Sequence, residues 1–208
     1  FLRTDPHLAG HLMFLTIGGS HAYGTNVEGS DINIRGVALN SREDLLGLGN
    51  FEHCVDTTTD TTVFAFNKFA LLASNGNPNV LELLGNDDDL VVSYNPVTKL
   101  LMDNKKLFLS KQAIKPFGGF VGGLLLKADG NYQALKLTWD NKEVRDRCQK
   151  KLNKLVMNVN RLYFMAFDLF EKGEIITYRG DEIDLLMKFR NGEYDYAEWR
   201  EHVVPVYE

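Results

Sequence analysis

A chain of 208 residues with 44 % hydrophobic and 25 % charged residues has the composition of a globular protein with a buried core. This excludes a disordered tail, a collagen-like fibre and a coiled-coil rod. The formal net charge of −5 excludes a uniformly basic coat protein for nucleic acid, but it leaves room for a local basic surface. With Cys54 and Cys148 as its only cysteines, the chain predicts neither a zinc site nor a disulfide framework, and the expected location is a reducing cytoplasm.

Targeting and membrane signals are missing from the sequence. No apolar run approaches the roughly 20 residues that a membrane helix needs, so no membrane partner is expected. The chain opens with Phe-Leu-Arg and shows no charged segment followed by an apolar one, which argues against a signal peptide. Because no initiator Met is present, we expect a short N-terminal piece to precede the numbered chain.

The first half of the chain alternates predicted strands and helices. Residues 12–17 form a short apolar run that stops at glycines, which is typical of a buried strand. Residues 32–39 alternate apolar and polar side chains and predict a second strand. Residues 61–66 are rich in β-branched and aromatic side chains and predict a third. Further elements are expected as helices at 67–75, from Asn77-Pro78 onward and at 96–103, with a short strand at 90–93 and a solvated loop or helix start at Asp87–Asp89.

The second half is predicted to be helical. Residues 115–123 contain one proline and four glycines, and we place a domain boundary near this segment. Residues 141–172 are long and periodic and end at Gly173, and residues 181–190 predict another helix. The expected fold class is α+β, with one domain at residues 1–113 and a helical domain at 114–208.

One segment carries the chemistry, and it runs from Gly18 to Val37. Gly18-Gly19-Ser20 predicts a tight turn, where glycine lets backbone N–H groups approach the oxygens of a triphosphate. Asp31 is expected to open the second strand with Asn33 on the same face, because strand side chains alternate. Acidic groups two apart on a strand can share Mg²⁺ ions, which hold the attacking and leaving oxygens of a phosphoryl displacement.

Gly-Ser, a spacer and then Ser-Asp-x-Asn resembles the Gly-Ser…Ser-Asp-x-Asp motif of the DNA polymerase beta nucleotidyltransferase superfamily. The likeness narrows with Asn77-Pro78-Asn79-Val80-Leu81-Glu82-Leu83-Leu84, the glycine-rich Phe117–Phe120 and the later Arg190–Tyr194. In this order the motifs are similar to those of the predicted bacterial and phage nucleotidyltransferases that include RNA-ligase-associated members of RNA repair operons. The resemblance runs through nearly the whole chain.

The resemblance implies a polymerase-beta-type nucleotidyltransferase domain with a short mixed β-sheet, followed by a helical domain that covers the active-site cleft. It also implies a third carboxylate on a neighbouring strand. Asp60 is the best candidate and Asp56 the second, while the alternative is that both merely cap a Thr-rich loop. By this resemblance Asp31, Asn33 and Asp60 would be the catalytic residues and would hold Mg²⁺ or Mn²⁺. Nucleotide binding would fall to Gly19, Ser20, Lys154 and Arg161.

The sequence departs from the family pattern in two places. Asn33 stands where the pattern has a second aspartate, so the site loses a negative charge while keeping a carbonyl oxygen. The long helix keeps Lys154 and Arg161 but lacks both histidines of the family's Lys-His-x-x-His-x-x-Arg-Leu pattern. Three accounts stay open: a degenerate pseudoenzyme, an enzyme with altered metal demands, or an engineered replacement at Asn33.

Several other polar residues each have two interpretations. His21 either contacts phosphate or base, or is satisfied by backbone; Tyr23 either stacks on a base or packs the turn against the sheet. Arg35 either reaches the active face or is solvated. Six basic residues near the start of the long helix form either a phosphate-binding patch or a solvated helix face: Lys142, Arg145, Arg147, Lys150, Lys151 and Lys154.

The expected reaction is transfer of a nucleoside monophosphate from an NTP to an acceptor hydroxyl, with release of pyrophosphate. By resemblance the acceptor is an RNA end. The alternative is a catalytically inactive protein that binds nucleotide or RNA, and a third option is transfer onto a protein or small molecule. A basic, elongated cleft would argue against that third option, whereas a small closed pocket would support it.

Overall fold

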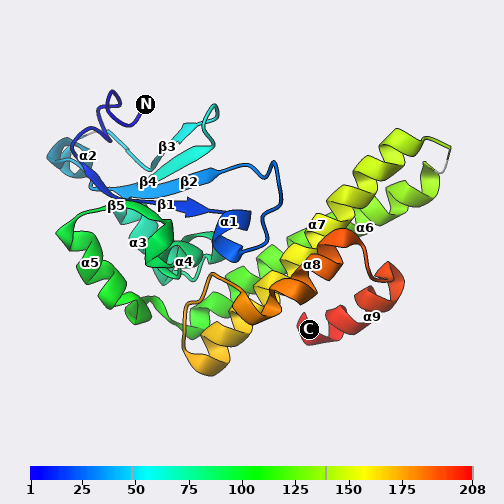
Figure 1. Ribbon diagram of the computed structural model, residues 1–208. Helices are drawn as coiled ribbons and strands as arrows, with labels where there is room; N and C mark the ends of the chain where they lie inside the picture. The colour runs from blue at the N-terminus through cyan, green and yellow to red at the C-terminus, as the bar shows by residue number, and fades with distance from the viewer. Residues whose placement is uncertain (48, 139, 208) are drawn as a thin grey trace.

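The computed structural model describes residues 1–47, 49–138 and 140–207, with side chains described as far as 203. A mixed sheet with helices on one face makes up the first half, and a bundle of helices makes up the second (Figure 1). This α+β architecture confirms the expected fold class. The strands of the sheet are β1 (Leu12–Gly18), β2 (Asn33–Ala38), β3 (His53–Asp56), β4 (Thr61–Ala65) and β5 (Val91–Tyr94).

The five strands lie in the order β3-β4-β2-β1-β5. β1 pairs antiparallel with β2 and β5, β2 pairs parallel with β4, and β3 pairs antiparallel with β4. The burial of the strands fits this order. The internal strand β1 is almost wholly buried, whereas the edge strands β3 and β5 are partly exposed. The parallel pairing matters for the site, since it brings the starts of β2 and β4 side by side.

Helices cover one face of the sheet (Figure 1). They are α3 (Phe66–Ser74), α4 (Pro78–Leu84) and α5 (Pro96–Asp103), while the single turn α1 (Ser20–Tyr23) follows β1. α4 begins as expected at Asn77, whose side chain caps the helix, with Pro78 in the first turn. The opposite face is covered by the N-terminal segment through Leu8 and by Phe51, which pack on β1 and β4. Shorter elements complete this half at α2 (Arg42–Leu46), η1 (Asp88–Leu90), η2 (Lys105–Phe108) and η3 (Lys111–Ala113).

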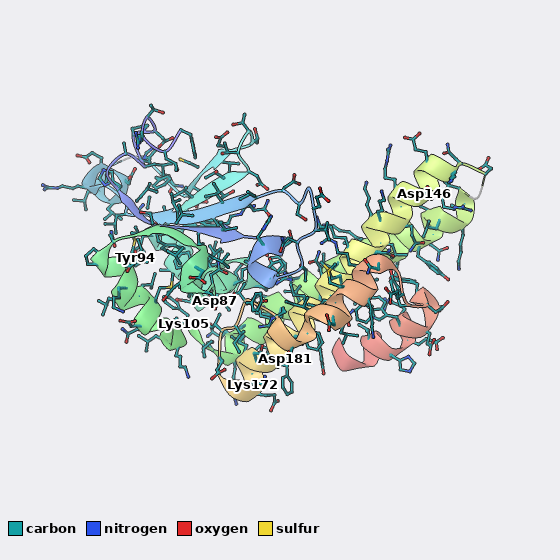
Figure 2. The ribbon with its side chains drawn as sticks, in the orientation of Figure 1. Asp87, Tyr94, Lys105, Asp146, Lys172 and Asp181 are labelled. Atoms are coloured by element: carbon teal, nitrogen blue, oxygen red, sulfur yellow. The ribbon has the colours of Figure 1, made fainter. Side chains whose placement is uncertain are left out.

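A long helical hairpin dominates the second half. It is formed by α6 (Ile114–Leu137) and α7 (Lys142–Phe167), and its outer end, where Asp146 is labelled in Figure 2, extends beyond the sheet. A π-helical turn, η4 (Asp168–Lys172), ends α7 at Gly173 in the left-handed conformation. The remaining elements are η5 (Gly180–Glu182), α8 (Ile183–Asn191), which packs on α7, and α9 (Tyr196–Tyr207).

One sequence prediction needs correction, and two features of the fold were not anticipated. The glycine-rich segment 115–123 forms the first part of α6, because Phe117, Val121 and Leu125 bury one face of the helix and outweigh the poor helix propensity of glycine. β2 begins at Asn33, so Asp31 lies in the loop before the strand rather than at its start. Strand β3 was missed, since a four-residue edge strand shows little periodicity.

The two halves share one hydrophobic core. Met13 and Phe14 of β1, Leu81 of α4, Phe117 of α6 and Val156 of α7 belong to the same buried cluster. The division at residues 113 and 114 stays a prediction, and it coincides with the start of α6. No helix in the described part of the chain has both the length and the apolar character needed to cross a membrane.

Candidate active site

A cleft of about 1030 Å³ lies where the ends of β1, β2 and β4 face the helical hairpin. The seven residues to which the family resemblance assigned catalysis or nucleotide binding all border this one cleft, although they come from positions 19 to 161: Gly19, Ser20, Asp31, Asn33, Asp60, Lys154 and Arg161. The tertiary structure therefore brings together the Gly-Ser turn, the acidic segment and the long helix. Their roles stay predictions, because proximity alone does not assign chemistry.

The Gly-Ser turn connects β1 to α1 at the edge of the cleft. Gly19 has φ 66°, a left-handed conformation that glycine adopts without strain. A Cβ at this position would also overlap the side-chain oxygen of Asn33. Glycine is therefore required here both by the backbone and by the close approach of the neighbouring strand.

Asn33 and Asp60 meet because β2 and β4 run parallel. Their register pairs Ile34 with Thr61, so the residues just before these positions lie side by side. Among the residues that the structure describes, Asp60 is the one non-glycine residue with a positive φ, at 45°. This is a strained backbone conformation, and it lies directly before β4. The Asn33 amide donates a hydrogen bond to one carboxylate oxygen of Asp60.

Arg35 occupies the other side of Asp60. Its Nη2 lies 3.1 Å from Asp60 Oδ1, and its Nη1 donates to the backbone carbonyl oxygen of Asp60 at 2.6 Å. Arg35 is therefore engaged with Asp60 rather than only solvated. Both carboxylate oxygens of Asp60 already have partners, one an amide and the other a guanidinium.

These residues do not form a metal site by themselves. Among the residues that the structure describes, no three His, Cys, Asp or Glu side chains gather closely enough to hold a metal ion. Asp31 is exposed on the loop before β2, and Asn33 supplies a neutral amide whose N–H already points at Asp60. The donor set present does not fit Mg²⁺ or Mn²⁺, which favour carboxylate oxygens free to coordinate.

Asp56 lies elsewhere and caps a turn. Its carboxylate accepts hydrogen bonds from the backbone N–H and hydroxyl of Thr58, at 3.0 and 2.6 Å, and from the hydroxyl of Thr59 at 2.9 Å. The Thr58 and Thr59 hydrogen bonds lower the pKa of Asp56. Asp56 does not border the cleft, so of the two candidates only Asp60 lies beside Asn33.

Behind the cleft, a buried cluster joins the two halves of the molecule. The hydroxyl of Tyr23 lies 2.8 Å from both carboxylate oxygens of Glu82, and Arg161 Nη1 lies 3.2 Å from Glu82 Oε2. The Arg161 guanidinium stacks over the Tyr23 ring, 3.7 Å from its centroid. Burial raises the pKa of the Tyr23 hydroxyl, which therefore stays protonated and donates to Glu82.

Lys154 and Arg161 consequently differ, although they share one face of α7. Lys154 is exposed at the cleft, whereas Arg161 is buried and committed to Glu82 and Tyr23. Tyr23 packs against Arg161 and Glu82, in line with the interpretation that it packs the turn. His21 Nε2 lies 3.4 Å from the backbone oxygen of Ser30, in line with the interpretation that backbone satisfies it. The other basic residues at the start of α7 lie exposed on the outer part of the hairpin.

Sequence reasoning missed three residues of this region. Lys127 of α6 and Arg190 of α8 border the cleft, and Arg190 also donates to the backbone oxygen of Thr25 at 2.9 Å. Glu82 was part of a quoted motif but received no role. A glutamate among the apolar side chains of α4 was the available signal, because buried carboxylates need partners.

Comparison with known proteins agrees with this geometry. The chain is 27 % identical over 198 residues to an uncharacterised 38.9 kDa protein from the nrdC-mobD intergenic region of enterobacteria phage T4; the aligned region covers 88 % of this chain and 54 % of that protein. The chain thus spans about half the length of the curated relative it matches. The sequence model of the RNA repair pathway DNA polymerase beta family matches residues 3–126, from the N-terminal segment into α6, and includes the Gly-Ser turn, Asp31, Asn33 and Asp60. Because the match covers more than half of the chain and the fold agrees with it, the chain belongs to this polymerase beta-like nucleotidyltransferase family.

Proposed function

We propose that the cleft binds a nucleoside triphosphate and that the chain transfers its nucleoside monophosphate to an acceptor hydroxyl, with an RNA end as the acceptor. The family match supports a nucleotidyltransferase-like function. The proposal of nucleoside monophosphate transfer rests on one observation: the Gly-Ser turn, Asp31, Asp60 and Lys154 all border one cleft. A cleft of this volume is large enough for a nucleotide.

Each side of the cleft has a role in this proposal. Ser20 and the backbone of the Gly-Ser turn would contact the phosphates, while Lys154, Lys127 and Arg190 would neutralise their charge from the helical side. Asp31 would accept a hydrogen bond from the acceptor hydroxyl. Mg²⁺ or Mn²⁺ would contribute charge neutralisation when bound, but with Asn33 and an engaged Asp60 the chain does not complete a site for the ion.

The second candidate is a protein that binds a nucleotide or RNA without catalysis. The hydrogen-bonded arrangement of Asn33, Asp60 and Arg35 favours it, because all three side chains already have partners. Electrostatic stabilisation is the main contribution to phosphoryl transfer, and an Asp60 held by an arginine supplies little of it.

The test compares this chain with Asn33→Asp, which places a second carboxylate beside Asp60. Each protein is incubated with the four α-labelled NTPs, Mg²⁺ or Mn²⁺ and a pool of tRNA and other RNA, and both transferred label and NTP binding are measured. Asn79→Asp is the matched control, because residue 79 also borders the cleft and gains the same charge.

Four results are informative. Label transferred by both the chain and Asn33→Asp supports an active enzyme, and label from Asn33→Asp alone shows a nucleotidyltransferase whose chemistry is impaired at residue 33. NTP binding without transfer by any variant supports the second candidate. Absence of NTP binding by all of them would contradict the nucleotidyltransferase and leave RNA binding as the remaining form of the second candidate.

A further inference from the structure

The outer part of the helical hairpin contributes little to the core. The buried residues of α6 end at Ala128 and those of α7 begin at Leu152, and no described residue between these two positions is buried. Leu137 is 80 % exposed. Figure 2 shows this end of the hairpin, labelled at Asp146, projecting away from the sheet. Ordering a segment that buries so little costs conformational entropy, so packing alone does not explain the length of the hairpin.

Positive charge is concentrated on the same part of the hairpin. Positions 142–154 hold six basic and two acidic residues, in a chain whose net charge is −5. All six basic side chains are exposed. Among the residues that the structure describes, Arg147 alone of the six forms an ion pair, with Glu143 at 3.3 Å, and both side chains of that pair are largely exposed. Little of this positive charge is therefore neutralised within the protein.

Four of these basic residues share one face of α7, because they recur at spacings of three and four residues: Arg147, Lys150, Lys151 and Lys154. We call these four residues the basic stripe. The same face continues inward to Asn158, which borders the cleft together with Lys154. The basic stripe therefore begins in the cleft and leads outward along the hairpin.

A row of exposed cations on one helix face fits a polyanion better than a single nucleotide. A stacked nucleic-acid strand carries one phosphate about every 3.4 Å, and basic side chains that neutralise several phosphates at once release their counterions. Arg147 lies seven residues, or about 10 Å of helix, beyond Lys154, which corresponds to about three stacked nucleotides. A strand whose end lies in the cleft would therefore reach the whole of the basic stripe.

We propose that the basic stripe binds the backbone of the acceptor RNA, a few nucleotides away from the end that enters the cleft. The inference rests on the proposed function, because it takes the acceptor to be RNA. It adds a contact surface outside the cleft, and it predicts that the affinity for RNA depends on the length of the strand.

The helix supplies a matched control. Arg147→Gln combined with Lys151→Gln removes half of the basic stripe. Lys142→Gln combined with Arg145→Gln removes the same two residue types from the same helix. Lys142 and Arg145 precede the buried Leu152 by ten and seven residues, so they lie on the side of α7 opposite to the stripe. Because all four side chains are exposed, both double variants should unfold at nearly the same temperature as the unchanged chain.

Binding is measured for NTP and for labelled single-stranded RNAs of about three and about twelve nucleotides, of which only the longer extends past Arg147. At about 0.1 M salt we expect the stripe variant to bind the longer RNA about tenfold more weakly or worse. The slope of log affinity against log salt should fall by about 1.4, since each contact with a single strand contributes about 0.7. The shorter RNA and NTP should bind within about twofold of the unchanged chain, and the control variant should bind every probe within about twofold.

Equal losses in the two double variants would overturn the inference, because they would show that the total charge of the hairpin matters rather than the stripe. An unchanged affinity of the stripe variant for the longer RNA would overturn it directly. Vesicles of phosphatidylserine and phosphatidylcholine are the remaining probe, since anionic lipid also attracts basic helices. Vesicle binding that is lost in the stripe variant, with RNA binding unaffected, would assign the stripe to a membrane surface instead.

These results also separate the inference from the proposed function. If the unchanged chain binds NTP but neither RNA, the stripe is wrong, whereas nucleotide binding in the cleft stands. If the chain binds the longer RNA through the stripe but binds no NTP, the proposed transfer fails and the stripe stands as the contact surface of an RNA-binding protein.

Discussion

The molecule contains two carboxylate–arginine clusters, one buried and one exposed, with nearly equal contact distances. In the buried cluster, Arg161 and Glu82 are 3.2 Å apart and their side chains are 7 % and 10 % exposed. In the cluster at the cleft, Arg35 and Asp60 are 3.1 Å apart and are 27 % and 51 % exposed. The distances are nearly equal, so the surroundings rather than the contact set the energetic consequence of each pair.

The buried cluster holds the two halves of the molecule together. It connects α1, α4 and α7, and an arginine left there without its carboxylate would be a desolvated charge with no partner. The cluster at the cleft is a surface arrangement, in which solvent screens the ion pair and its contribution to stability is small. One arrangement therefore holds the two halves together, and the other contributes little to the stability of the fold.

The largest expected effect comes from breaking the buried cluster. Glu82→Gln keeps the size of the side chain but removes the charge that Arg161 needs, and we expect the free energy of unfolding in urea to fall by about 3 to 5 kcal/mol. The control is Glu82→Gln combined with Arg161→Met, which removes the unpaired charge and should recover most of the loss. A double variant no more stable than Glu82→Gln would show that the pair is not the cause.

Residue 19 comes next, because two effects combine there. Gly19→Ala forces a side chain into a left-handed backbone and against Asn33, and we expect a loss of about 1 to 3 kcal/mol in unfolding free energy together with weaker NTP binding. Gly10→Ala is the matched control, since Gly10 has φ 79° with no atom within 4 Å of an added Cβ. Equal losses at both positions would mean that the approach of Asn33 contributes nothing.

A third carboxylate, Asp129, has intermediate exposure and connects α6 to α9. It pairs with Arg200 at 3.1 and 3.2 Å and accepts a hydrogen bond from Tyr196 at 2.8 Å. Partial burial alone would raise the pKa of Asp129, but the hydrogen bonds from Arg200 and Tyr196 outweigh it and hold that pKa below its ordinary value. The ionised form is therefore favoured in the folded chain.

The sign of the pH effect follows from this direction. Because the pKa of Asp129 is lower in the folded than in the unfolded chain, its stabilising contribution is complete above about pH 4 and is lost as the pH falls through the folded value. We expect Asp129→Asn to reduce the unfolding free energy by at most about 1 kcal/mol at pH 7 and to flatten its acid dependence. An unchanged acid profile in this variant would contradict the assignment.

The smallest effect is expected at the exposed pair. A double-mutant cycle with Arg35→Ala and Asp60→Ala should give a coupling of less than about 1 kcal/mol, and that coupling should decline further as salt is raised. A salt-independent coupling as large as that of Glu82 and Arg161 would remove the distinction between the two clusters.

The sequence by itself determined the elements whose signals are local. Period and length predicted the buried strand at 12–17 and the long helix that ends at Gly173, and the Gly-Ser…Ser-Asp spacing pointed to the family that the comparison then showed. Such features depend on neighbouring residues, so one sequence suffices to recognise them. The position of Asp60 beside Asn33 could not be recognised in this way, because it depends on the parallel pairing of β2 and β4.

Only the tertiary structure decided what each charged side chain contacts. Lys154 and Arg161 share one face of a helix and look alike in sequence, but α4 and α1 bury one of them and leave the other at the cleft. The glycine-rich segment 115–123 likewise gave no helix signal in sequence, and its helix forms because the buried face packs against α7. Burial and pairing arise between residues far apart in the chain, and local pattern carries no record of them.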